Sequence, residues 1–155
     1  MAKISIVMGS ESDLGTVNET VKVLKDFGAD FELRVLSAHR APDNLKKYVK
    51  EAAKKGIKVF IAAAGGAAAL AGVIASNTTL PVIGVPIETK SLKGLDSLLS
   101  TVQMPTGVPV ATMAIGKAGA RNAAIFALEI LAVSDKKIQA KLARHKNEMR
   151  LKLKR

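Results

Sequence analysis

Five short apolar runs, each followed by a stretch of helical character, constrain the fold of this 155-residue chain more than any other feature. The runs are rich in β-branched residues and are bounded by turn residues, which is typical of strands. They cover residues 3–8, 31–36, 57–63, 81–85 and 108–115. Strands that alternate with helices form parallel sheets, because the chain must cross back between them. The sequence therefore predicts an α/β fold around a parallel five-stranded sheet.

The helices between these strands are marked by residues that favour helix starts and ends. We expect the first to begin near Asp13 and the second to run from Pro42 to Gly56, since proline suits a first helical position. Later helices are expected to end near residue 77 and to cover 92–102 and 118–133. Ser134 or Asp135 can cap one more helix to about Leu151. Its apolar stripe is so thin that we expect it to contact a neighbouring subunit rather than its own core.

Composition fits one globular domain over residues 1–155, with 48% hydrophobic and 24% charged residues. Cysteine is absent, which excludes disulfides and thiolate chemistry. The first expected strand begins at Lys3, and no apolar run approaches the roughly 20 residues that a membrane helix needs. We therefore expect a cytoplasmic protein with no signal peptide and no membrane span.

The net charge of +11 is concentrated at the carboxyl end, where residues 134–155 carry nine Lys or Arg against Asp135 and Glu148. A basic tail can bind nucleic acid or an anionic membrane. No aromatic residue accompanies these charges for base stacking. A solvated or subunit-contacting helix is the preferred interpretation, and nucleic-acid binding is kept as a minor alternative.

Polar and glycine-rich segments follow the first three expected strands. In an open parallel sheet, ligands bind at the carboxyl ends of the strands. Ser10 and Ser12 offer hydroxyls for a phosphate, and Asp13 can accept hydrogen bonds from ribose, although the same pattern also makes a plain helix cap. The pair Gly65 and Gly66 permits close approach to a ligand, or serves only a tight turn.

His39 follows the second expected strand, between Ser37 and Arg40. Histidine titrates near neutral pH, and arginine grips phosphate or carboxylate in a two-pronged geometry. This combination suits a reaction in which a proton is moved on an anionic substrate. The alternative is that His39 is a structural histidine. His145 lies among basic residues and is interpreted as a solvated surface residue, so the two histidines argue against a metal site. No dinucleotide or P-loop phosphate motif occurs.

Taken together, these motifs resemble the class I N5-carboxyaminoimidazole ribonucleotide mutases, the family of the bacterial phosphoribosylaminoimidazole carboxylase catalytic subunit. The resemblance covers residues 3–133 in order. It is carried by Met8-Gly9-Ser10-Glu11-Ser12-Asp13, Ser37-Ala38-His39-Arg40-Ala41-Pro42, Gly65-Gly66-Ala67-Ala68, Leu80-Pro81-Val82-Ile83-Gly84-Val85-Pro86, Gly94-Leu95-Asp96-Ser97-Leu98, Val102-Gln103-Met104-Pro105 and Ala114-Ile115-Gly116-Lys117-Ala118-Gly119-Ala120.

The resemblance implies a three-layer flavodoxin-like domain with an extra C-terminal helix, assembled as a homo-octamer. It implies an enzyme of purine biosynthesis that moves a carboxylate from N5 to C4 of aminoimidazole ribonucleotide, without a metal or organic cofactor. His39 would carry the proton. The substrate-binding residues would be Ser10, Ser12, Ser37 and Arg40 at the phosphate, Asp13 at the ribose, and Gly65, Gly66, Ala67, Ala69 and Leu70 in the glycine-rich turn.

One departure from the family pattern stands in that turn. The family pattern is Gly-Gly-Ala-Ala-His-Leu-Pro-Gly, whereas Ala69 and Ala71 replace the histidine and the proline here. Ala69 removes a donor beside the substrate, and Ala71 frees a backbone angle. The leading hypothesis is a mutase, and the sequence leaves open whether these two changes reduce its activity. The alternative is an octameric scaffold with lost or altered catalysis. The sequence leaves open whether N5-carboxyaminoimidazole ribonucleotide or carbon dioxide with aminoimidazole ribonucleotide is the substrate.

Overall fold

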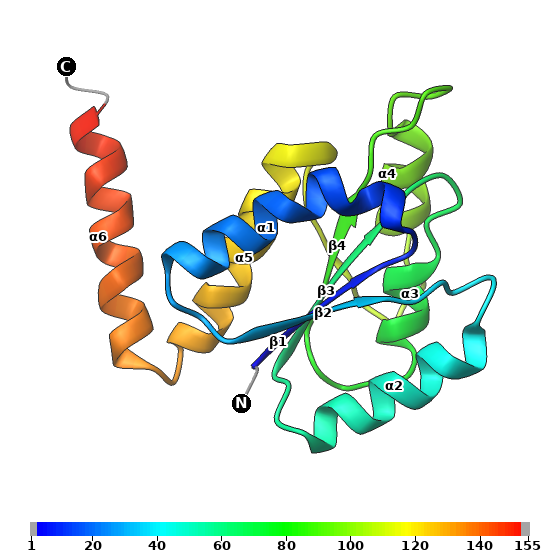
Figure 1. The fold of residues 1–155 in the computed structure, drawn as a ribbon, viewed down its shortest axis with the longest axis horizontal. Coiled ribbons are helices and arrows are strands. Elements are labelled where there is room, and N and C mark those ends of the chain that lie inside the picture. Colours follow the sequence, from blue (N-terminus) through cyan, green and yellow to red (C-terminus); the bar gives the residue numbers. More distant parts are fainter. Residues whose placement is uncertain (1–2, 153–155) are drawn as a thin grey trace.

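A twisted five-stranded sheet with helices on both faces forms the centre of the computed structural model, which describes residues 3–152 (Figure 1). All neighbouring strands are parallel, and their spatial order is β2-β1-β3-β4-β5. This is the order of flavodoxin-like folds. The predicted fold class is therefore confirmed. The strands are β1 (Ile4–Met8), β2 (Phe31–Val35), β3 (Val59–Ala64), β4 (Val82–Pro86) and β5 (Ala111–Thr112).

The helices alternate with the strands as predicted, and a sixth follows the last unit. A 3₁₀ turn, η1 (Glu11–Asp13), leads into the first helix. The helices are α1 (Leu14–Asp26), α2 (Pro42–Lys54), α3 (Leu70–Ala75), α4 (Leu95–Val102), α5 (Gly116–Ala132) and α6 (Lys136–Lys152). None of the helices within residues 3–152 has both the length and the apolar character needed to cross a bilayer.

Two hydrophobic clusters, one on each face of the sheet, hold the layers together. In β1, Ile4 and Ile6 belong to the cluster under α1 and α5, whereas Val7 belongs to the cluster under α2 and α3. This division follows from the alternation of side chains along a strand. Alanines of α5 lie against α1, and the Thr20 hydroxyl donates to the carbonyl of Ala120 at 2.8 Å. Small side chains thus allow these two helices to approach closely.

The fifth strand is much shorter than the expected segment 108–115. Only Ala111 and Thr112 pair with β4, and one further bond runs from the Met113 N–H to the Gly84 carbonyl at 2.9 Å. This strand lies at the sheet edge, where it has one neighbour. On the amino side, Pro109 has no N–H to donate to a ladder, and on the carboxyl side the chain turns at Gly116, with φ 75°, into α5. The predicted bounds 108–115 were therefore wrong at both ends.

The last helix is capped by Asp135, whose carboxylate accepts the N–H groups of Lys137 at 3.0 Å and Ile138 at 3.3 Å. The expectation that α6 packs away from its own core was partly wrong, because Leu142 is 6% exposed and joins the cluster under α1 and α5. His145 is not simply solvated either, since its ring makes an edge contact with Phe27. In Figure 1, the outer half of α6 (red) extends beyond the other helices.

Candidate active site

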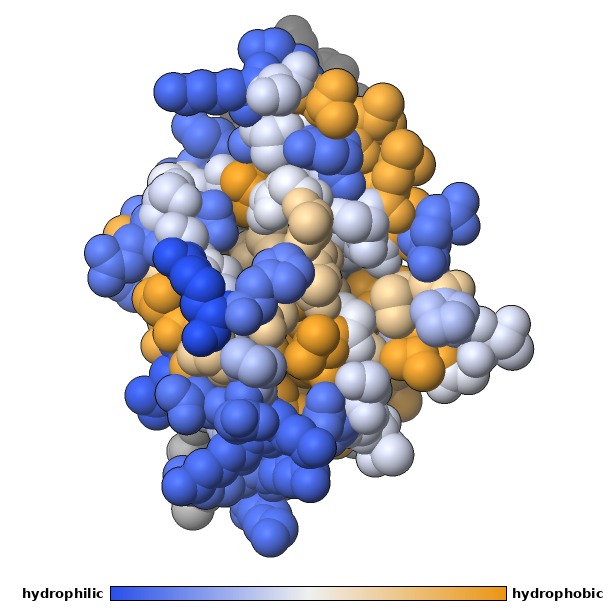
Figure 2. Space-filling model, turned by 90° about the vertical axis from the view of Figure 1, so that its right-hand side faces the viewer, coloured by the Kyte–Doolittle hydropathy of each residue, from blue (hydrophilic) through white to orange (hydrophobic). Residues whose placement is uncertain are grey.

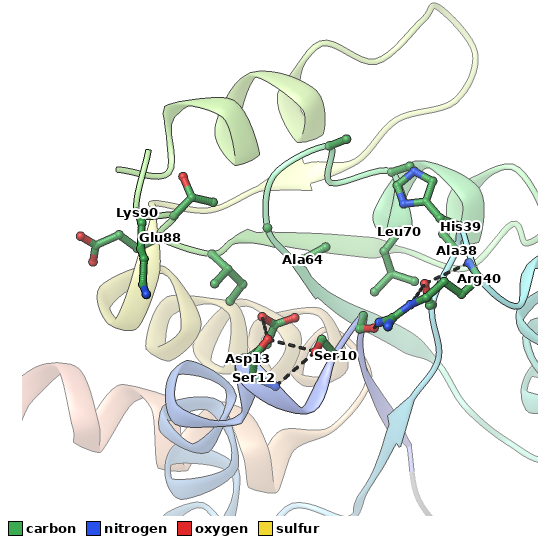
Figure 3. Close-up of a pocket in the computed structure, with 17 residues that line it drawn as sticks. Ser10, Ser12, Asp13, Ala38, His39, Arg40, Ala64, Leu70, Glu88 and Lys90 are labelled. Atoms are coloured by element: carbon green, nitrogen blue, oxygen red, sulfur yellow. Dashed lines mark hydrogen bonds between the residues drawn. The ribbon is translucent and has the colours of Figure 1, made fainter. Parts of the chain in front are cut away.

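A cavity of about 640 Å³ opens at the carboxyl ends of β1, β2, β3 and β4. Side chains from four segments line it, within residues 9–13, 37–40, 64–70 and 87–90. Four loops meet here because the carboxyl ends of parallel strands lie at one edge of the sheet. Figure 3 shows Ser10, Ser12 and Asp13 on one side, His39 and Arg40 on another, and Glu88 and Lys90 across the cavity.

The segment after β1 presents two hydroxyls held by a local cap. Ser10 precedes η1, and its hydroxyl oxygen accepts the Ser12 N–H at 3.3 Å. The Ser12 hydroxyl lies 3.0 Å from the Ser10 hydroxyl oxygen and 3.3 Å from a carboxylate oxygen of Asp13. The sequence left a cap and an anion site as alternatives. The cap is formed by Ser10, and both hydroxyls line the cavity, so the cap does not exclude an anion site.

Asp13 is the buried acid of the site, with 8% of its surface exposed. Burial raises the pKa of its carboxyl above the ordinary value of 3.8, and hydrogen bonds from the Ser12 side chain and the Ser10 backbone partly oppose this shift. A buried carboxylate with spare acceptor positions suits the hydroxyl groups of a sugar.

Arg40 connects the loops after β1 and β2. Its guanidinium donates to the Gly9 carbonyl at 3.3 Å and to the Ser37 hydroxyl oxygen at 3.4 Å, and its backbone N–H donates to the same hydroxyl at 3.2 Å. Arg40 and His39 are both exposed in the isolated chain and line the cavity. The loop thus brings a fixed cation and a titratable ring to the same space.

The turn after β3 forms another part of the lining. Gly65, Ala67, Ala69 and Leu70 line the cavity as the sequence predicted. Gly66 is not among the lining residues. Its φ of 69° requires the freedom of glycine, and its N–H donates to the Ser97 hydroxyl oxygen at 2.9 Å.

Of the two alanines that depart from the family pattern, only Ala69 reaches the cavity. It immediately precedes α3 and is half-buried. Ala71 is 2% exposed and packs over β4, where a Cβ placed on Gly84 would lie 3.5 Å from the Cβ of Ala71. The first alanine therefore belongs to the lining itself, whereas the second belongs to the packing behind it.

The sequence analysis did not identify the segment after β4 as part of the site. Glu88, Thr89 and Lys90 all line the cavity. Their position could have identified them, because they come just after β4 in the same way that the other three lining segments come just after β1, β2 and β3. Within residues 3–152, no three His, Asp or Glu side chains gather closely enough to hold a metal ion.

Comparison with known proteins gives a consistent result. A family model described as AIR carboxylase matches residues 3–152. An N5-carboxyaminoimidazole ribonucleotide mutase from Saccharolobus solfataricus is 55% identical over 97% of this chain and 94% of the relative. A protein of the same name from Pyrococcus abyssi is 54% identical over 97% of this chain and 85% of the relative. The crystal structure of Treponema denticola PurE superposes with a TM-score of 0.88 at 28% identity, covering 97% of this chain and 92% of that one.

Proposed function

The chain belongs to the AIR carboxylase family, and we propose from this premise that it is an enzyme of purine biosynthesis that moves a carboxylate from N5 to C4 of aminoimidazole ribonucleotide. Relatives at 54% and 55% identity carry the name of this mutase, which favours catalysis over a purely structural scaffold. One structural observation carries the proposal. The cavity brings a histidine together with hydroxyls, a guanidinium and a buried carboxylate, the groups that a reacting nucleotide needs.

In this proposal, two loops hold the nucleotide. Ser10, Ser12, Ser37 and Arg40, which we term the phosphate grip, bind the phosphate through hydroxyls and a charge-assisted guanidinium contact. The Arg40 guanidinium already lies against the Gly9 carbonyl and the Ser37 hydroxyl, so little ordering remains for binding. Asp13 accepts hydrogen bonds from the ribose.

His39 moves the proton. The bond between N5 and the carboxylate carbon breaks as the imidazolium donates a proton to N5, which releases carbon dioxide and the amine. Carbon 4 then attacks the carbon dioxide, and the resulting carboxylated ring loses its C4 proton to the imidazole. The proton gained in the last step balances the one given in the first, so one histidine acts as acid and then as base.

The assay that tests this function compares two substrate sets with the purified chain. We expect 4-carboxyaminoimidazole ribonucleotide to form from N5-carboxyaminoimidazole ribonucleotide, monitored by its ultraviolet absorbance. Aminoimidazole ribonucleotide with bicarbonate at the same concentrations should react far more slowly. Absence of product from both sets would overturn the proposal. Preference for the second set would replace the mutase with a carboxylase.

Trapped carbon dioxide needs a cavity closed to water. His39 and Arg40 are exposed in the single chain, so we propose that assembly into a homo-octamer supplies the cover. Apolar side chains on and beside α4 support an interface, with exposed fractions between 46% and 58% for Leu92, Leu95, Leu99 and Val102. Figure 2, which views the side where α4 lies in Figure 1, shows hydrophobic residues at the surface in its upper part.

Light scattering tests the assembly, with an expected mass of eight times the 16.3 kDa of one chain. A monomeric mass would contradict it.

We further propose that residues 1–155 form a single domain and that the protein acts in the cytoplasm, where it would meet its nucleotide substrate.

A further inference from the structure

Helix α4 contributes no residue to the cavity lining, yet its hydroxyls are bonded to two segments that do. Ser97 is the central one. Its hydroxyl oxygen accepts the Gly66 N–H at 2.9 Å, and its hydroxyl hydrogen is donated to the Ile87 carbonyl at 2.6 Å. One fully buried side chain therefore joins the turn after β3 to the segment after β4.

Three neighbouring contacts reinforce the junction. The Ser100 hydroxyl oxygen accepts the Ala68 N–H at 2.9 Å. Thr89 donates to the Asp96 carboxylate at 2.8 Å and accepts the Gly94 N–H at 3.2 Å. The two segments also touch directly, since a Cβ placed on Gly65 would lie 3.4 Å from the Ile87 Cβ. We term these segments, residues 64–70 and 87–90, the braced wall.

The braced wall carries Ala67, Ala69 and Leu70, which line the cavity together with His39 from another loop. For the two alanines, the backbone position alone sets where the side chain lies. A displacement of about 1 Å between reacting groups can lower a rate by about 100-fold. The contacts that fix the wall therefore bear on catalysis without touching the substrate.

We infer that Ser97 is a positioning residue for carboxylate transfer: it fixes the braced wall relative to His39, so that released carbon dioxide stays over C4. The inference rests on the proposed function. Ser97 acts on the chemical step, because the wall faces the reacting ring. The affinity for the substrate phosphate does not depend on Ser97, because the phosphate grip belongs to the loops after β1 and β2.

The test compares three variants of the full chain. Ser97→Ala removes the buried bridge, and Ser100→Ala removes a part-buried bond that an exposed hydroxyl makes to the N–H of buried Ala68. Thr101→Val is the matched control. Thr101 is also a buried hydroxyl of α4, but it donates to the Ser97 carbonyl within the helix at 2.7 Å. All three are assayed for kcat and KM with N5-carboxyaminoimidazole ribonucleotide, for Tm, and for amide hydrogen exchange across residues 65–69.

We expect Ser97→Ala to lower kcat by about 10- to 100-fold with KM nearly unchanged, since a misplaced wall affects the transition state more than ground-state binding. Ser100→Ala should lower kcat less, and Thr101→Val should leave it near wild type. The Tm values of Ser97→Ala and Thr101→Val should fall by similar amounts, because both substitutions remove a buried hydroxyl. Exchange at Gly66 and Ala68 should accelerate in Ser97→Ala and not in Thr101→Val.

Two outcomes overturn the inference. An active wild type whose Ser97→Ala variant keeps its kcat would remove Ser97 from catalysis. Equal losses of kcat in Ser97→Ala and Thr101→Val would show that helix stability alone is responsible. An inactive wild type would overturn the proposed function instead, and the exchange measurement would then still show whether Ser97 braces the wall.

Discussion

The phosphate grip and the braced wall form two sides of one cavity and are built in different ways. The grip consists of side chains on loops, and its cation, Arg40, is exposed and held by contacts of 3.2 to 3.4 Å. The wall consists largely of backbone and small side chains, fixed from behind by the buried Ser97. The grip is thus ordered by contacts among its own exposed side chains, whereas the wall is ordered by a buried residue outside the cavity, and in the proposed reaction it keeps a small neutral molecule in place.

His39 belongs to the same loop as Ser37 and Arg40 of the grip, but in the proposed reaction it acts on the ring that faces the wall, so its replacement should give the largest effect. We expect His39→Asn to lower kcat by about 100- to 10,000-fold, because an amide cannot exchange a proton at neutral pH. Circular dichroism and light scattering should be unchanged, since asparagine is a polar side chain of similar size. Wild-type turnover in this variant would assign the proton carrier to another residue.

The wall itself can be changed by restoring the family residues. We expect Ala69→His with Ala71→Pro to raise kcat, by up to about 100-fold, because a donor at position 69 would face the reacting carboxylate. Proline is tolerated at position 71, in the first turn of α3. Ala71→Pro alone separates the backbone effect from the donor. A flat or lower kcat in the double variant, with assembly preserved, would mean that the alanine turn is adapted to another ligand.

The grip is tested by Arg40→Ala. We expect KM to rise by about 10- to 100-fold, since a charge-assisted hydrogen bond contributes about 1.5–3 kcal/mol. At saturating substrate, kcat should change little. Lys90→Ala provides the matched control, because Lys90 is also an exposed cation that lines the cavity, but from the wall. If both variants raise KM equally, the division between grip and wall fails.

The smallest effect concerns stability at Asp13. Burial raises the pKa of its carboxyl, so ionisation destabilises the fold, and stability should fall as pH rises from about 3.8 through the pKa of the folded protein. Asp13→Asn should therefore have a higher Tm at neutral pH, and the advantage should disappear below pH 3.8. KM should rise as the ribose loses an acceptor. The exposed neighbour Glu11, changed to Gln, should show no such gain.

Sequence patterns predicted the sheet, the helices and most of the lining, because these depend on local periodicity and on the rule that sites lie at strand ends. The motifs around Ser10 and His39 could be placed at strand ends from the sequence alone, and both line the cavity. The roles assigned to them stay predictions until they are assayed.

Ser97 and the fifth strand show what local patterns miss. A serine within a helix gives no local sign that it bonds a turn 31 residues away. The apolar run 108–115 predicts a full strand, yet its edge position, Pro109 and the turn at Gly116 limit the pairing to two residues. Both features depend on tertiary neighbours, which a pattern within one segment does not supply.

Helix α6 acts as a lever. It is anchored by the Asp135 cap, by Leu142, by the contact of His145 with Phe27 and by the ion pair of Lys146 with Glu129, and six residues follow this anchor to Lys152. At 1.5 Å per residue, these six residues reach about 9 Å, so a tilt of about 10° at the anchor moves the tip by about 1.6 Å. A substitution at Leu142 would thus be magnified at Met149 and Leu151, whose apolar side chains are about half exposed.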